Sequence, residues 1–207
     1  MSGKTSGVCL LATILAGAAV QANAANIVAD PGFESGIPGS YTGAMGDGWV
    51  VTAGTGAICN VSGAGCGNSG PAHTGTQMAF LDWSDTFNSI TQTLTTDIGQ
   101  VYSISFWVFG DHPNLLNVTF GGSTLFDGTA PATSDYVQFT FNATATSTAT
   151  VLAFSGQRTV RGVELLDDVS VTAVPEPATW LLTSAALLGL AVLRRRHSTA
   201  VQAVRSF

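Results

Sequence analysis

The central part of this sequence lacks lysine and carries almost no positive charge. Between residues 25 and 173 it holds ten aspartates and two glutamates against two arginines, Arg158 and Arg161, so its formal charge is −10. Such a surface repels nucleic acid, and no basic stripe offsets the repulsion. We therefore exclude nucleic acid as a partner and expect a soluble, acidic module that can attract divalent cations.

Catalytic motifs are missing as well. No Gly-x-Ser-x-Gly sequence surrounds a serine, and neither a His-Glu-x-x-His helix nor a glycine-rich phosphate loop occurs. Two glutamates in this part of the chain leave little choice for the paired carboxylates of a glycosidase. The sequence therefore predicts a protein that is not an enzyme, and a secreted hydrolase of unknown type is the least favoured alternative.

Cysteine is scarce, with three residues in the chain, and Cys9 lies in a segment that we expect to be removed. The remaining pair, Cys59 and Cys66, stands in a glycine-rich stretch with no histidine or further cysteine at zinc spacing. In an oxidising compartment these two residues would form a disulfide that closes a small loop. We predict that disulfide.

The first residues have the pattern of a secretory signal peptide. Lys4 precedes a mostly apolar stretch, 8–20, and Ala22-Asn23-Ala24 provides an Ala-x-Ala cleavage site. Residues 1–24 are therefore interpreted as a signal peptide, and a permanent N-terminal anchor is the alternative. Residues 25–173 then form one domain of ordinary size.

The last part of the chain has the pattern of a short membrane helix. Val174-Pro175-Glu176-Pro177 precedes an uncharged run, 178–193, and then three consecutive arginines, Arg194, Arg195 and Arg196. As a helix the run would extend about 24 Å, slightly less than a hydrocarbon core of about 30 Å, which local thinning can accommodate. Arginines behind an apolar helix are held on the cytoplasmic side, so residues 197–207 would be a cytoplasmic tail.

This order of a proline break, a short helix and an arginine cluster over residues 174–196 resembles the PEP-CTERM sorting signal of bacterial surface proteins. The resemblance implies that Val174, Pro175, Glu176 and Pro177 are recognised by exosortase, a membrane-embedded processing enzyme. The protein would then be exported, held in the inner membrane by its C-terminal helix, and released to the cell surface or exterior with exopolysaccharide. A plain C-terminal anchor with an incidental Pro-Glu-Pro is the alternative.

The central part alternates with the period of β-strands. Apolar residues recur at every second position in segments 102–109, 116–120 and 136–141, and shorter patterns occur near 90–94, 152–154 and 169–171. Gly121-Gly122 and Asp127-Gly128 are interpreted as turns between strands. Short strands without crossover helices predict an all-β fold, an antiparallel β-sandwich.

A second resemblance joins several short motifs in order. They are Asn26–Glu34 with its Gly-Phe-Glu end, Gly48-Trp49, the segments 90–94 and 99–107, and Leu166-Asp167-Asp168-Val169. Together they resemble the galactose-binding-like jelly roll of many carbohydrate-binding modules. The resemblance implies a structural calcium ion held by Glu34 and Asp168, with Asp167 and Asp30 as possible helpers. The alternative is that these are solvated carboxylates or acceptors for turn amides.

A glycan site would need exposed aromatic rings beside polar groups. Trp83, which has Asp82, Asp85 and Phe87 nearby in the sequence, and Trp107 are the candidates, although most aromatic residues of a β-sandwich belong to its core. We interpret His73 and His112 as solvated loop residues. The preferred function is that of a non-catalytic surface or matrix protein, and a true carbohydrate-binding module is the second.

Overall fold

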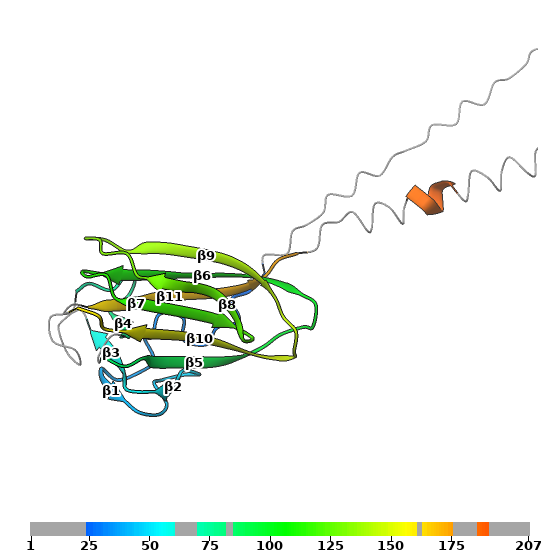
Figure 1. The fold of residues 1–207 in the computed structure, drawn as a ribbon. Helices are drawn as coiled ribbons and strands as arrows, with labels where there is room; N and C mark the ends of the chain where they lie inside the picture. Colours follow the sequence, from blue (N-terminus) through cyan, green and yellow to red (C-terminus); the bar gives the residue numbers. More distant parts are fainter. Residues whose placement is uncertain (1–23, 61–69, 82–84, 161–162, 176–185, 191–207) are drawn as a thin grey trace, which may run out of the picture. The chain divides into compact units, whose positions relative to one another are not determined.

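A computed structural model describes residues 24–60, 70–81, 85–160, 163–175 and 186–190. Ala24–Val174 form one compact unit, a sandwich of two antiparallel sheets (Figure 1). The other unit combines Met1–Asn23 with Pro175–Phe207, and within it residues 186–190 are helical with exposed side chains. Among the residues described here, no helix is long and apolar enough to cross a bilayer.

The larger sheet has six strands in the order β1-β3-β4-β11-β6-β9, and the smaller has five in the order β2-β5-β10-β7-β8. The larger sheet comprises β1 (Gly39–Tyr41), β3 (Gly56–Asn60), β4 (Gln77–Phe80), β11 (Glu164–Ala173), β6 (Val101–Gly110) and β9 (Val137–Thr144). The smaller comprises β2 (Val50–Ala53), β5 (Asn88–Thr95), β10 (Ala149–Gln157), β7 (Leu115–Phe120) and β8 (Ser123–Thr129). The predicted antiparallel β-sandwich is confirmed.

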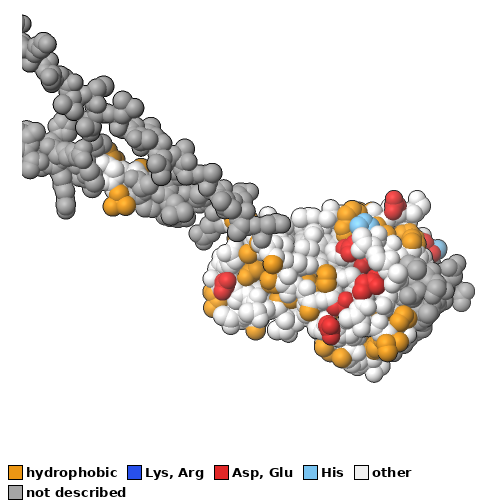
Figure 2. Space-filling view, turned by 180° about the vertical axis from the view of Figure 1, so that it is seen from behind, with side chains coloured by type: hydrophobic (Ala, Val, Ile, Leu, Met, Phe, Trp, Pro, Cys, Tyr) orange, Lys and Arg blue, Asp and Glu red, His pale blue; other side chains and the backbone are white. Residues whose placement is uncertain are grey.

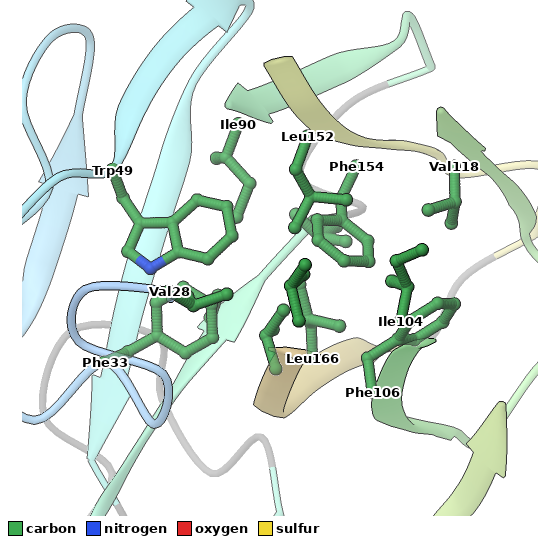
Figure 3. Close-up of a cluster of buried hydrophobic side chains, with 14 of the residues drawn as sticks. Val28, Phe33, Trp49, Ile90, Ile104, Phe106, Val118, Leu152, Phe154 and Leu166 are labelled. Atoms are coloured by element: carbon green, nitrogen blue, oxygen red, sulfur yellow. The ribbon is translucent and has the colours of Figure 1, made fainter. Parts of the chain in front are cut away.

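The core lies between the sheets and follows the alternation of the strands. In β6 the even-numbered residues from Tyr102 to Val108 are buried, and the odd-numbered ones between them are partly exposed. Trp49 is fully buried, with its ring centroid 5.2 Å from that of Phe33 and 6.0 Å from that of Phe154 (Figure 3). Its indole N–H donates to the Asp30 carbonyl at 3.0 Å, which supplies the partner that a buried tryptophan needs.

One of the two predicted turns is correct. Gly121 and Gly122 join β7 to β8 with φ values of +58° and +81°, a conformation that glycine adopts without strain. The predicted turn at Asp127-Gly128 is wrong, because both residues lie inside β8 and pair with Asn117 and Leu116 of β7. Cross-strand pairing therefore overrides the local turn preference of an Asp-Gly step.

Both ends of the compact unit lie near the end of β11. Ile27 N–H donates to the Val171 carbonyl at 3.0 Å, and Val174 N–H donates to the Val101 carbonyl at 2.8 Å. The Asn26 side chain adds bonds to Val169 and Val171. Since β5 runs from Asn88 towards the turn that leads into Val101, the beginning of β5 lies at the opposite end of the sandwich, about 25 Å away.

Candidate functional site

The outer face of the smaller sheet carries a shallow pocket of about 320 Å³. It is lined by Phe87, Asn117, Asp127 and Ser155. The sheet register places Asp127 opposite Asn117 and Asn117 opposite Ser155, so these residues form a row across β8, β7 and β10. Phe87 directly precedes β5, the next strand along. The fold therefore brings an aromatic ring to one end of a line of polar side chains spanning about 10 Å.

The lining groups have complementary chemistry. Phe87 keeps 44% of its surface exposed, so its ring is available for an apolar contact. Asn117 offers both a donor and an acceptor, and the Asp127 carboxylate offers acceptors. The Ser155 hydroxyl lies 2.5 Å from that of Ser89 on β5, which restrains its position. An aromatic surface beside donors and acceptors suits a ligand with an apolar face and many hydroxyl groups.

A polar bridge holds the segment that carries Phe87. The Arg158 guanidinium contacts Asp85 Oδ1 at 3.0 and 3.2 Å, and Gln157 Nε2 donates to the Asp85 carbonyl at 2.6 Å. The ion pair is exposed to solvent and contributes little to overall stability. Its effect is local, because it ties the chain before β5 to the end of β10 at the margin of the pocket.

A second polar region lies where the segment before β1 meets β11. A Cβ atom built on Gly32 would lie 3.6 Å from Asp167 Oδ1, 3.7 Å from Asp168 Oδ1 and 3.8 Å from Glu34 Cγ. A register shift in β11 between Asp167 and Ser170, with Asp168 at φ +47°, lets both consecutive aspartates reach this region. Figure 2 shows acidic side chains gathered beside a histidine on this face. We call Glu34, Asp167 and Asp168 the carboxylate cluster.

Each member of the carboxylate cluster already has hydrogen-bond partners. Backbone amides donate to Glu34 and Asp167, whereas the His73 ring and the Thr74 hydroxyl contact Asp168. Glu34 accepts bonds from the Thr76 and Gln77 amides at 2.6 and 2.7 Å, and these lower its pKa although partial burial opposes the shift. Asp167 accepts bonds from the His73 and Thr74 amides at 2.8 and 3.2 Å. Burial, together with the negative charge of Asp168, nevertheless raises the pKa of Asp167 to about 7. The cluster therefore concentrates negative charge that its own hydrogen bonds only partly stabilise.

The carboxylates of the cluster and the neighbouring Gln77 side chain offer oxygen atoms, the type of ligand that calcium prefers. The Oε1 atom of Gln77, whose amide groups both bond to Glu34, is buried without a hydrogen-bond partner. Within the described ranges no three acidic, histidine or cysteine side chains form a metal-binding group by themselves. A bound cation would therefore need carbonyl oxygens beside the carboxylates, which is the mixture that calcium accepts. Asp30, the other predicted helper, accepts hydrogen bonds from the amide and hydroxyl of Ser35.

The interpretation of His73 as a solvated loop residue is wrong. Its ring stacks on Trp107 with centroids 3.9 Å apart and meets Tyr136 edge-on, while Nδ1 lies 2.5 Å from Asp168 Oδ2. The loop folds back over the outer face of the larger sheet, where Tyr136 donates to the Pro71 carbonyl at 2.9 Å. Trp107 is half-buried, and His73 covers one face of its ring, so its role in binding a sugar stays a prediction.

Several predicted site residues fall outside the described residues. They are Trp83, Cys66, Glu176, Pro177 and the arginine cluster, together with residues 1–23 of the predicted signal peptide. Cys59 is buried and disulfide-bonded, as predicted, and its pairing with Cys66 stays a prediction.

Sequence reasoning did not identify Asn117, Asp127 and Ser155 as neighbours in one site. Alternation along the predicted strands indicates that Asn117 and Ser155 point outward, whereas Asp127 was assigned to a turn. Only the order of the strands in the sheet brings them together.

Comparison with known proteins identifies the fold and no family. No protein-family model matches this sequence, and no curated protein does. Among solved structures, TmCBM61 in complex with β-1,4-galactotriose aligns with a TM-score of 0.51 and 16% identity, over 72% of this chain and 99% of that chain. The tandem CBM22-1–CBM22-2 domain of Paenibacillus barcinonensis Xyn10C aligns with a TM-score of 0.51 and 18% identity, over 77% of this chain and 50% of that chain. The compact unit thus has the jelly-roll fold of carbohydrate-binding modules.

Proposed function

We propose that residues 25–173 form a non-catalytic glycan-binding module whose ligand lies on the outer face of the smaller sheet. The observation that carries this proposal is the pocket in which the exposed ring of Phe87 flanks the row of Asp127, Asn117 and Ser155. The fold shared with TmCBM61, which was solved with a galactotriose, supports it. The pocket replaces Trp107 as the leading candidate, because His73 covers part of that ring.

The chemistry of the pocket favours a neutral glycan. A pyranose ring can lay its apolar face on Phe87 while its hydroxyl groups bond to Asn117 and Asp127. The row crosses adjacent strands, so it can follow consecutive sugar units of a chain. A glycan carrying uronic acid or sulfate groups would meet the Asp127 carboxylate and a domain of net charge −10, and we expect it to bind more weakly.

The test is affinity electrophoresis of the exported protein in gels containing galactan, xylan or, for contrast, polygalacturonate. Phe87→Ala should weaken retention by a neutral glycan at least tenfold, which corresponds to about 1.4 kcal/mol. Ile98→Ala is the matched control, because Ile98 is an exposed apolar residue in the turn after β5, at the other end of the sandwich. Equal retention of both variants, or retention by polygalacturonate alone, would refute this site.

We also propose the route by which the module reaches the cell surface. The signal peptide would direct export, the helix 178–193 would hold the precursor in the membrane, and exosortase would process it near Pro175–Pro177. Support comes from the order of these segments in the sequence. Intact-mass analysis of the surface form should show loss of residues after this motif. Retention of Phe207 would instead indicate a permanent anchor.

A structural calcium ion at the carboxylate cluster is the third part of the proposal. Glu34, Asp167 and Asp168 would supply carboxylate oxygens and Gln77 its carbonyl oxygen, which would neutralise charge and tie the N-terminal segment to β11. After chelation, calcium should raise the melting temperature of the wild type and leave Glu34→Gln unchanged. An equal rise for both proteins would place the ion elsewhere. If calcium does not raise the melting temperature of the wild type, the protein has no structural calcium site.

A further inference from the structure

The two sheets have four edge strands, and three of them are poor templates for pairing with another chain. β1 has three residues and β2 has four. β8 carries Asp127 and has a register shift opposite Val118 and Thr119. Short length, charge and irregular register are the means by which proteins protect sheet edges from association.

The fourth edge, β9, has none of these protections. Its eight residues, VQFTFNAT, include no charge, proline or glycine, and they pair with β6 in regular register from Val137 to Thr144. Among the described strands none lies beyond β9, which runs along the margin of the larger sheet (Figure 1). The backbone N–H and C=O groups on its outer side are therefore available to another strand.

We propose that β9 pairs antiparallel with β9 of a second copy of this chain, so that two larger sheets join into one. Charge favours a second copy at this edge in particular. Residues 25–173 carry a net charge of −10, so the domains of two copies repel each other over most of their surfaces. The sequence from Tyr136 to Gln157, in contrast, has no charged residue. The nearest preceding acid, Asp135, lies outside the strand.

The side chains of β9 are complementary to themselves. A two-fold axis at Thr140 places Phe139 opposite Phe141 of the partner subunit and Gln138 opposite Asn142 of the partner subunit. The two phenylalanines of each pair then lie on one face of the joined sheet, and the two amide side chains lie on the other face. Phe139 and Phe141 are partly exposed, and both stack on Phe106, at 5.4 and 6.1 Å between centroids. Their rings are therefore held in place before the second copy arrives, and cross-strand aromatic pairs stabilise antiparallel sheets.

The pairing can be tested by disulfide trapping in the full chain, expressed with its export signals. In this register Thr140 lies opposite Thr140 of the partner subunit, at a Cα separation of about 5 Å, which permits a disulfide. Thr140→Cys should give a covalent dimer on non-reducing gels. Thr93 is exposed and lies on β5, which is not an edge strand of the smaller sheet. The Thr93→Cys variant should therefore stay monomeric. Absence of the Thr140→Cys dimer, or equal dimer from both variants, would overturn the proposal.

A second measurement avoids cysteine altogether. Sedimentation of the processed surface form should show a concentration-dependent dimer that Thr140→Lys abolishes, because two lysines would face each other at the axis. Thr93→Lys should leave the dimer intact, and circular dichroism should confirm that both variants are folded. A wild type that stays monomeric, or a dimer that survives Thr140→Lys, would contradict pairing through β9.

Discussion

Replacing Asp167 by asparagine should remove a pH dependence of stability that this one buried carboxyl creates. Its pKa is about 7 in the folded protein against 3.8 as the ordinary value. Between these values the folded state holds a proton that the unfolded state has lost, so raising the pH favours unfolding. Each pH unit changes the free energy of unfolding by about 1.4 kcal/mol, and the whole interval by about 4 kcal/mol.

The assay is urea unfolding of the chelated protein at several pH values from about 5 to about 6.5, where the slope is steepest. The wild type should lose stability as the pH rises, and Asp167→Asn should show a flatter profile. Asp97→Asn changes an exposed carboxyl in the turn after β5 and should keep the wild-type slope. A wild-type profile as flat as that of Asp167→Asn would refute the assigned pKa. Added calcium should also reduce the wild-type slope if the ion binds the ionised cluster.

Three further predictions have definite expected outcomes. Gly75→Ala should lower the urea midpoint more than Gly99→Ala. Both glycines have positive φ. A Cβ built on Gly75 would lie 2.2 Å from Glu34 Oε1, whereas a Cβ built on Gly99 would meet no atom within 4 Å. Phe154→Ala should cost about 3–5 kcal/mol in urea unfolding, while Phe87→Ala should leave stability nearly unchanged. Peptide mapping without reduction should recover Cys59 joined to Cys66, and a free Cys66 thiol would disprove that pairing.

Local patterns were sufficient to predict most of the strands. The alternation around Phe106, Val118 and Phe139 marks β6, β7 and β9, because one face of each strand is buried between the sheets. These features depend on neighbours within a few residues, which a single sequence displays directly.

The features that were missed depend on contacts between distant segments. His73 follows Gly70 and Pro71, which suggests an exposed loop, yet its partners Trp107 and Asp168 come from two other strands. Likewise, the row in the pocket requires knowing that β7 lies between β8 and β10. No pattern within one segment specifies that order, because it results from how both sheets share a core.

The placement of the chain ends has a consequence for where a ligand can be captured. Val174, the last residue of the compact unit, donates its N–H to the Val101 carbonyl. Phe87 lies about 25 Å away, at the far end of β5. A precursor tethered through Val174 would therefore carry Phe87 and the pocket at the end of the domain that lies farthest from the membrane attachment. Polymers passing outside the cell could then be reached before the tether is cut.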